Sequence, residues 1–425
     1  MRTLITNVEL LDKPNGELYK IALEDHKIVG VGKRAPAGFK ADKIYDGKGM
    51  LATPGMVNTH GHVSMTILRS YADDLALMDW LNNHIWPIEG KMNAEDIYWG
   101  AMLGIAEMLK GGTTCFTDMY SYMDEVAKAS AELGIRANLC VGVIGFKPCA
   151  QQDIQDNVEL FQKWHGYDEG RIRVTLGPHA PYTCPDDIMK KIITVAKEQG
   201  MEVQMHLCET QDEIQGSLKD YGMTPIERMD KLGLFECGVI AAHCVHLTEK
   251  DMEIMAAKKV RVAHNPQSNL KLASGIADVP AMQKHGIVVG LGTDGTSSNN
   301  NLDMLEEIRL AATLHKASHF DPLLVPAAEA WKMGTVNGAK VLGFENLGEL
   351  KKGQFADIVL WDMHKPYWYP RNNKLSLLVY AASANDADTV FVNGQMVVEG
   401  GKLTLFDEEK IYAKINERMQ DLLQR

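Results

Sequence analysis

Short apolar runs alternate with longer amphipathic segments from about residue 50 to about residue 345. Eight of the runs are predicted strands: Met50–Asn58, Thr113–Thr117, Arg136–Ile144, Arg171–Leu176, Glu202–His206, Gly238–Ala242, Val260–His264 and Ile287–Gly292. Predicted helices between them include Ala94–Lys110, Asp124–Leu133, Pro185–Gln199, Lys250–Lys258 and Leu302–His315, with Asn93 and Thr248 as N-caps. Eight alternations in about 290 residues predict an α/β fold, a (β/α)₈ TIM-like barrel. A doubly wound open sheet is the alternative, but no Gly-x-Gly-x-x-Gly follows a first strand.

The two ends of the chain show a different sequence pattern, which predicts short strands and tight turns. Leu18–Leu23 and Lys27–Val31 form a predicted hairpin near the N-terminus. Near the C-terminus Ala356–Trp361 is a predicted strand, Asn393-Gly394 is a type I′ turn signal, and residues 408–424 form a predicted helix. We therefore expect residues 1–52 and 346–425 to build one small β-sandwich, and residues 53–345 to form the barrel.

Charge and cysteine usage narrow the classes of partner and compartment. The net charge of −12 disfavours non-specific binding to nucleic acid, which requires Lys and Arg side chains. The seven cysteines include no Cys-x-x-Cys pair and are typical of free thiols in a reducing compartment. The first residues have no signal-peptide character, and no apolar run approaches the ~20 residues of a membrane span. A cytoplasmic protein is expected, without membrane partners; self-association as a homo-oligomer stays open.

Ionisable side chains collect where the predicted strands end. In a β/α barrel the carboxyl ends of the strands form the rim that carries the active site. Five of the fourteen histidines, together with Glu209 and Asp294, fall at this rim: His60 and His62 after the first strand, His179 after the fourth, His206 and Glu209 at the fifth, His243 at the sixth and Asp294 at the eighth. One such histidine would more often be structural, but this many on one rim predict a metal centre.

The expected ligands are His60, His62, His206 and Asp294. Imidazole and carboxylate donors suit zinc, with iron(II) as the alternative, and leave a position for an activated water. One metal is expected per chain. Two-metal barrels of this kind usually carry a bridging lysine after the fourth strand, whereas the nearest lysines here, Lys190 and Lys191, lie well inside the next helix.

These residues and several longer strings resemble the amidohydrolase superfamily and, within it, the 5′-methylthioadenosine/S-adenosylhomocysteine deaminase family. The resemblance spans nearly the whole chain and is carried by the following segments: His60-Gly61-His62, Trp80-Leu81, Trp86-Pro87-Ile88-Glu89, Gly177-Pro178-His179-Ala180-Pro181-Tyr182, His206-Leu207-Cys208-Glu209-Thr210, His264-Asn265-Pro266, Ser268-Asn269-Leu270-Lys271 and Thr293-Asp294-Gly295. It implies that Glu89 binds the ribose hydroxyls and that His179 hydrogen-bonds a purine ring nitrogen. Taken alone, Glu89 would be a solvated loop charge and His179 a turn-capping imidazole.

The resemblance also implies a hydrolytic deamination at C6 of adenine, releasing ammonia and leaving the inosine analogue. Asp294 would take a proton from the attacking water, and His243 would orient that water. Glu209 would contact the substrate and donate a proton to the ring nitrogen next to C6. A helix-start carboxylate is the simpler interpretation of Glu209, and both interpretations can hold together.

The 5′ end of the nucleoside is where this sequence departs from the family pattern. Members that accept S-adenosylhomocysteine are expected to have an arginine near the end of the third strand, but Arg136 lies at its start. Lys147 is a substitute without the bidentate guanidinium geometry. The apolar residues Val141, Ile144 and Phe146 favour an uncharged 5′-group, as in 5′-methylthioadenosine, 5′-deoxyadenosine or adenosine.

Three other functions compete with this prediction. Guanine deaminases and triazine hydrolases resemble the chain at the metal site and would not need Glu89. A non-catalytic barrel that acts as an assembly protein would be expected to lose metal ligands. The unrelated zinc nucleobase deaminases are excluded, because no His-x-Glu is paired with Pro-Cys-x-x-Cys.

Overall fold

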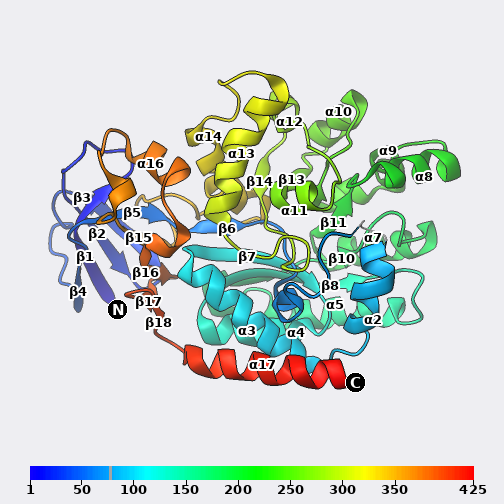
Figure 1. Cartoon of the computed structure of the whole chain (residues 1–425), viewed down its shortest axis with the longest axis horizontal. Helices are drawn as coiled ribbons and strands as arrows, with labels where there is room; N and C mark the ends of the chain where they lie inside the picture. Colours follow the sequence, from blue (N-terminus) through cyan, green and yellow to red (C-terminus); the bar gives the residue numbers. More distant parts are fainter. Residues whose placement is uncertain (76–78) are drawn as a thin grey trace.

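The computed structural model describes residues 1–75 and 79–425 and contains a closed barrel of parallel strands (Figure 1). Its wall consists of β6 (Met56–Asn58), β7 (Thr113–Tyr120), β8 (Arg136–Val143), β9 (Ile172–Val174) continued by β10 (Gly177–Pro178), β11 (Val203–Leu207), β12 (Val239–His243), β13 (Arg261–His264) and β14 (Val289–Leu291). Parallel ladders join the strands from β6 to β10 and from β11 to β14. The bridges Leu176–Val203 and Gly61–Asp294 connect the two halves, and the predicted (β/α)₈ barrel is confirmed.

Helices follow the strands around the barrel. They are α3 (Ala94–Lys110), α4 (Met123–Leu133), α5 (Ala150–Trp164), α6 (Tyr167–Gly170), α7 (Asp186–Gln199), α8 (Gln211–Tyr221), α9 (Pro225–Leu232), α10 (Glu249–Ala257), α11 (Pro266–Lys271), α12 (Val279–Lys284), α13 (Met304–His319), α14 (Ala327–Met333) and α15 (Val336–Val341). The longer ones, such as α3, α4, α7 and α13, bury apolar side chains. Asn93 and Thr248 form capping boxes at the starts of α3 and α10, as the sequence predicts. Between β6 and α3 the chain forms the short helices η1 (Val63–Leu68), η2 (Trp80–Ile85) and α2 (Trp86–Glu89).

Both ends of the chain contribute to one nine-stranded sheet beside the barrel, where the blue and the orange-to-red strands of Figure 1 lie together. Its strands are β1 (Arg2–Leu10), β2 (Tyr19–Glu24), β3 (Lys27–Gly32), β4 (Lys43–Asp46), β5 (Met50–Pro54), β15 (Ile358–Asp362), β16 (Ala387–Val392), β17 (Gln395–Glu399) and β18 (Lys402–Leu403). They enclose a shared core that includes Ile5, Ile21, Ile358 and Phe391. The β-rich unit expected from the two termini is confirmed. Two further helices lie in the C-terminal segment: α17 (Glu408–Gln424) packs along α3, and α16 (Lys374–Tyr380) packs against α13 and α14.

Two predicted strands differ from the structure in ways that matter for the site. The run Met50–Asn58 is divided at Gly55, where β5 ends its pairing with β15 and β6 begins the barrel. A Cβ atom on Gly55 would lie 2.1 Å from Thr114 Oγ1, so this change of sheet requires a glycine. β7 continues to Tyr120, three residues beyond its predicted end. The division of the chain into 1–52, 53–345 and 346–425 stays a prediction.

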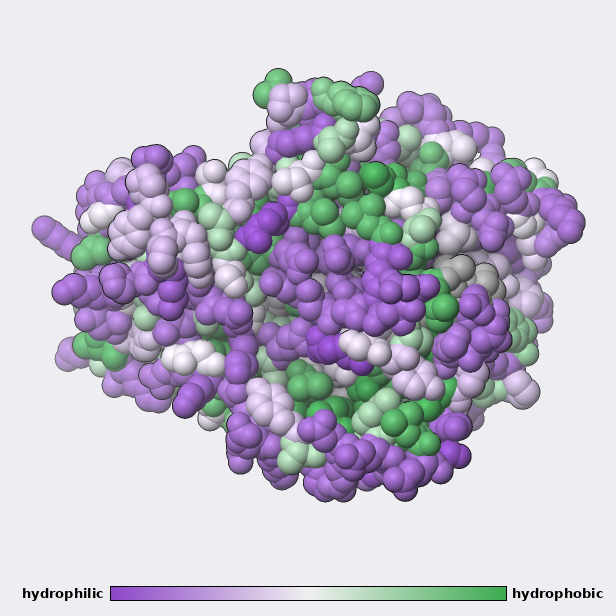
Figure 2. Space-filling model, viewed as in Figure 1, coloured by the Kyte–Doolittle hydropathy of each residue, from purple (hydrophilic) through white to green (hydrophobic). Residues whose placement is uncertain are grey.

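The surface carries mainly hydrophilic side chains on the face drawn in Figure 2. Among the described residues, no helix has both the length and the apolar character needed to cross a membrane.

A buried ion pair fixes the barrel to the terminal sheet. Arg136 at the start of β8 donates from Nε and Nη2 to the two carboxylate oxygens of Asp357, both at 3.0 Å. Both side chains are fully buried, and Asn393 of the β16–β17 turn contacts both of them. Arg136 therefore has a structural partner at the barrel end opposite the catalytic rim, as its position at the strand start predicts.

Replacing Asp357 with Asn should destabilise the protein, because it leaves the Arg136 charge buried without a counter-charge. The expected loss in the free energy of unfolding, measured by urea denaturation, is about 3–5 kcal/mol. The matched control is Glu236→Gln, which breaks the exposed Lys197–Glu236 pair and should cost less than about 1 kcal/mol. Equal effects of the two substitutions would contradict this account of the interface.

Candidate active site

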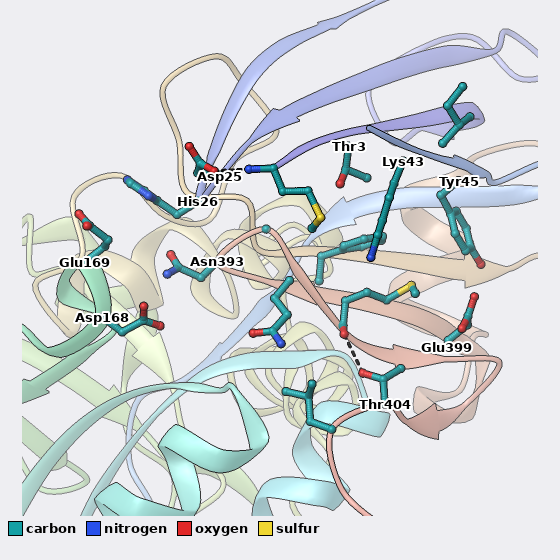
Figure 3. Close-up of a pocket in the computed structure, with 17 residues that line it drawn as sticks. Thr3, Asp25, His26, Lys43, Tyr45, Asp168, Glu169, Asn393, Glu399 and Thr404 are labelled. Atoms are coloured by element: carbon teal, nitrogen blue, oxygen red, sulfur yellow. Dashed lines mark hydrogen bonds and ion pairs between the residues drawn. The ribbon is translucent and has the colours of Figure 1, made fainter. Parts of the chain in front are cut away.

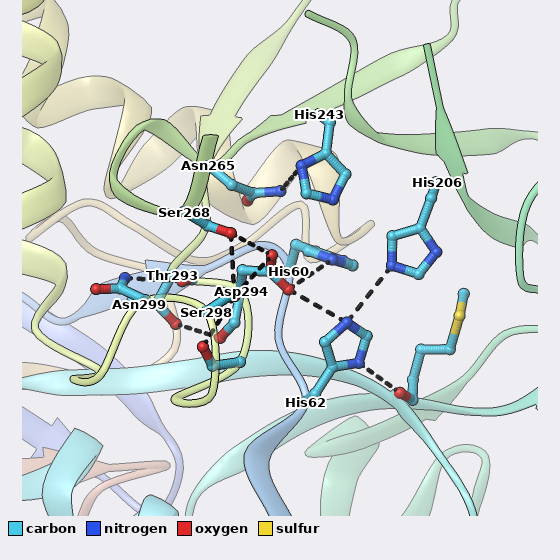
Figure 4. A network of polar contacts seen from close by, with 12 residues as sticks. His60, His62, His206, His243, Asn265, Ser268, Thr293, Asp294, Ser298 and Asn299 are labelled. Atoms are coloured by element: carbon cyan, nitrogen blue, oxygen red, sulfur yellow. Dashed lines mark hydrogen bonds and ion pairs between the residues drawn. The ribbon is translucent and has the colours of Figure 1, made fainter. Parts of the chain in front are cut away.

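Three imidazole rings and one carboxylate converge at the carboxyl ends of β6, β11 and β14 (Figure 4). His206 Nε2 lies 3.4 Å from His62 Nε2. Asp294 Oδ1 lies 3.4 Å from His60 Nε2 and 3.2 Å from His62 Nε2. These are the four residues that the sequence predicts as metal ligands. A second grouping of His60, His243 and Asp294 overlaps with them.

Backbone carbonyls fix which ring nitrogen of each histidine faces the centre. His62 Nδ1 donates to the Met119 carbonyl oxygen at 2.7 Å, and His206 Nδ1 donates to the His179 carbonyl oxygen at 2.7 Å. In the neutral rings both Nε2 atoms then present a lone pair to the centre. His60 Nε2 is buried and makes no hydrogen bond to any residue in 1–75 or 79–425. This is the donor arrangement of a metal site, in which the second ring nitrogen is anchored by the protein.

The pKa shifts of His60, His206 and Asp294 favour metal binding. The pKa of His62 is instead raised to about 9, because the adjacent Asp294 outweighs the effect of burial, so a metal ion has to displace a proton from that ring. Burial lowers the pKa of His60 to about 4 and, with the neighbouring rings, lowers that of His206 well below its usual value. Burial opposes ionisation of Asp294, but the adjacent His60 and His62 rings hold its pKa well below the usual range. Neutral imidazoles and an ionised carboxylate are the forms that bind metal. The residues fit a divalent metal ion.

Two serine hydroxyls orient the Asp294 carboxylate. Ser268 Oγ donates to Asp294 Oδ2 at 2.6 Å, and Ser298 Oγ lies 3.2 Å from the same oxygen. Oδ1 is thereby left to face His60 and His62. Asp294 itself has a φ of 60°, a left-handed conformation that costs energy for a non-glycine residue and turns its side chain over the barrel mouth.

His243 and Glu209 lie next to this cluster. His243 Nδ1 is 2.8 Å from Asn269 Oδ1, to which it donates, so its Nε2 carries a lone pair toward the site. That Nε2 lies 3.9 Å from Glu209 Oε2. Burial raises the pKa of the Glu209 carboxyl, which favours a proton-carrying form. Glu213 holds the segment after β11 that carries Glu209. Its carboxylate accepts hydrogen bonds from the backbone N–H groups of Cys208 and Glu209, at 3.0 and 2.9 Å.

A cavity of about 500 Å³ opens over the cluster. Every predicted site residue except His60 borders it: His62, Glu89, His179, His206, Glu209, His243 and Asp294. His60 lies beneath them and is buried. Apolar side chains of Met65, Leu81, Trp86, Met92 and Met119 complete the wall.

The expected apolar wall at the 5′ end is only partly present. Ile144 borders the cavity, whereas Val141 is buried and Phe146 is 60% exposed. The cause is the turn after β8, which carries Phe146 away from the rim. Lys147 borders the same cavity.

Sequence reasoning missed several residues that orient the site. Ser268 and Asn269 lie in a string noted for its resemblance, but no spacing rule connects them with Asp294 or His243. Tyr120 borders the cavity at the end of β7, and Asp118 of the same strand accepts from the Val63 N–H at 2.8 Å. The strand-end rule would have found both, had β7 been predicted to its full length.

A larger hollow of about 980 Å³ lies elsewhere, beside the terminal sheet (Figure 3). Thr3, Lys43, Tyr45, Asn393 and Glu399 are among its lining residues. Its histidine, His26, is not part of either metal-binding group among the described residues. The catalytic chemistry therefore belongs to the smaller cavity over the barrel mouth.

Solved structures with the same architecture include complexes with zinc. The family model described as the amidohydrolase family matches residues 51–397. A zinc-bound crystal structure of an adenosine deaminase from Xanthomonas campestris is 33% identical, with a TM-score of 0.93, and covers 100% of this chain and 99% of its own. A zinc complex of atrazine chlorohydrolase from Arthrobacter aurescens is 25% identical, with a TM-score of 0.89 and coverage of 98% and 100%.

Sequence relatives agree with the structural ones. A protein of Dictyoglomus thermophilum named 5-methylthioadenosine/S-adenosylhomocysteine deaminase is 52% identical over 386 residues, which are 91% of each chain. The family match covers most of the sequence and includes all of the candidate metal-binding residues described above. This chain belongs to the amidohydrolase family.

Proposed function

We propose that the protein is a hydrolytic deaminase of adenosine-type nucleosides that uses one zinc ion per chain. The observation that carries the proposal is the cavity in which Glu89, His179 and Glu209 face the cluster of His60, His62, His206 and Asp294. The names of the relatives, a methylthioadenosine/adenosylhomocysteine deaminase and a zinc-bound adenosine deaminase, support the same substrate class. Iron(II) is the alternative metal.

Zinc, when bound, supplies a positive charge that activates water and stabilises negative charge in the transition state. Asp294 acts as the base that accepts a proton from the attacking water. Ser268 and Ser298 contact its Oδ2, so Oδ1 is the oxygen that faces the site. His243 accepts a hydrogen bond from that water through Nε2 and so orients it toward C6 of the adenine ring.

Glu209 supplies the proton that makes C6 electrophilic. Burial raises the pKa of its carboxyl, which favours the protonated form that gives its proton to the ring nitrogen next to C6. The water oxygen forms a bond to C6, the C6–N bond breaks, and the amino group leaves as ammonia after gaining a proton through Asp294 and Glu209. The sum is nucleoside plus water giving the inosine analogue plus ammonia.

Glu89 and His179 orient the nucleoside. A carboxylate accepts two hydrogen bonds from a vicinal diol, so Glu89 binds the ribose hydroxyls. When the His179 ring carries its proton on Nε2, this Nε2–H donates to a purine nitrogen. The unprotonated Nδ1 then faces Thr183 Oγ1, which lies 3.0 Å away. The apolar wall of Met65, Leu81, Trp86 and Met92 favours an uncharged 5′-group, and Lys147 offers one positive charge for S-adenosylhomocysteine.

Two alternatives are weaker on specific grounds. A triazine hydrolase or guanine deaminase has no ribose for Glu89 to bind, although Glu89 borders the cavity here. A non-catalytic assembly barrel would not need the ligand cluster, Glu209 and His243 to converge.

His206→Ala should remove the metal, because it deletes a central donor and leaves a gap in the cluster. Elemental analysis of the purified variant should find less than about a tenth of the wild-type metal, in keeping with the loss of a direct ligand. The control is His285→Ala, a part-buried histidine outside the site that is paired with Glu249, which should keep full occupancy. Full occupancy in the His206 variant would refute this ligand set.

Glu209→Gln should keep the metal and lose turnover, because the amide cannot transfer the proton. A fall in kcat of about 10²-fold or more is expected from the loss of general acid catalysis. The exposed Glu198→Gln serves as the matched control and should be indistinguishable from wild type. Near wild-type kcat in the Glu209 variant would remove Glu209 from the mechanism.

The substrate class is tested by steady-state kinetics on 5′-methylthioadenosine, S-adenosylhomocysteine, adenosine and guanine. We expect kcat/KM to be highest for an adenine nucleoside with an uncharged 5′-group, with little or no activity on guanine. Preference for guanine would replace the proposal with a guanine deaminase.

A further inference from the structure

Tyr120 is a cavity residue that the mechanism above does not use. It is the last residue of β7, and its side chain borders the cavity. Its hydroxyl donates to Glu89 Oε1 and lies 3.9 Å from Met92 Sδ. Its ring lies near His62, with centroids 6.3 Å apart. Tyr120 thus connects the metal-side wall of the cavity with the carboxylate at the opposite wall.

The direction of this hydrogen bond is fixed by chemistry. Burial, and then the nearby Glu89 charge, raises the pKa of the Tyr120 phenol well above its usual value. The phenol therefore stays protonated and acts as the donor. Burial raises the pKa of Glu89, and the Tyr120 hydrogen bond opposes this rise by stabilising the ionised carboxylate, which can only accept. The bond uses one lone pair of Oε1 and leaves Oε2 and the remaining lone pair of Oε1 to accept from a ligand.

Glu89 needs such an anchor because of where it lies. It ends α2, which continues the helical segment of η2 outside the barrel wall. A diol presents two O–H donors at a fixed spacing, so the carboxylate must be held in one plane to receive both. Among the described residues the Glu89 carboxylate has one hydrogen-bond partner, the hydroxyl of Tyr120, and β7, which carries Tyr120, is part of the barrel.

We propose that Tyr120 is a positioning residue that sets selectivity for the ribose diol through Glu89. The inference rests on the proposed nucleoside deaminase activity. Its consequence is specific: loss of the hydroxyl weakens recognition of the 2′- and 3′-hydroxyls and leaves the chemistry at C6 intact.

The test compares adenosine with 2′-deoxyadenosine on the metal-loaded protein, for wild type, Tyr120→Phe, Glu89→Gln and the double variant. Tyr120→Phe should lower the adenosine-to-deoxyadenosine ratio of kcat/KM by about 10-fold, the worth of one hydrogen bond to a charged group. The change should appear in KM for adenosine, with kcat and the deoxyadenosine constants near wild type. The double variant should be no less selective than Glu89→Gln, because both substitutions remove the same interaction.

The control is Tyr98→Phe, which removes another tyrosine–glutamate hydrogen bond, 2.8 Å long and joined to Glu132 on the outer helices. It should leave the ratio unchanged. A general structural role of Tyr120 would lower kcat/KM equally for both nucleosides, and this outcome would overturn the inference while deamination itself stands. Absence of deamination of both nucleosides by the wild-type protein would instead overturn the proposed function, and the inference with it.

Discussion

The hydrogen bonds that close the barrel between β6 and β14 are the constraint on which the site depends. Thr59 N–H donates to the Leu291 carbonyl at 2.8 Å, and Asp294 N–H donates to the His60 carbonyl at 3.0 Å. These bonds place the two histidines after the first strand against the aspartate after the last. The seam tolerates no side chain at Gly292, where a Cβ atom would lie 2.7 Å from His60 N. Closure of the barrel therefore also brings His60 and His62 against Asp294.

The cluster is arranged in advance for a cation. The rings of His62 and His206 direct Nε2 toward the centre of the cluster, and the buried Asp294 carboxylate raises the pKa of His62, so the cluster favours a positive charge at its centre. Main-chain carbonyls anchor the rings of His62 and His206, and hydroxyls anchor Asp294, so little reorganisation accompanies metal binding. Residues farther from the cluster hold other site residues in the same way. Glu213 accepts from the Glu209 N–H, and the Tyr120 hydroxyl donates to Glu89.

Periodic features of the sequence predicted most of the fold. Strand and helix alternation, the caps at Asn93 and Thr248 and the Asn393-Gly394 turn depend on neighbouring residues, which a sequence displays directly. The rim histidines followed from one topological rule. Ser268 and Asn269 were not predicted, because they act through contacts between loops. Tyr120 was not predicted, because β7 extends beyond its apolar run. Phe146 was misplaced, since the direction of the turn after β8 has no periodic signature.

The central claim is that this site hydrolyses the C6–N bond of an adenine nucleoside with water activated at a metal. Incubation of the zinc-loaded protein with 5′-methylthioadenosine in oxygen-18 water tests it most directly, with mass spectrometry of the product and assay of ammonia. The account predicts one labelled oxygen at C6 and one ammonia for each nucleoside consumed, and neither product with chelator-treated protein. Unlabelled product, conversion without ammonia, or full activity of the metal-free protein would contradict it.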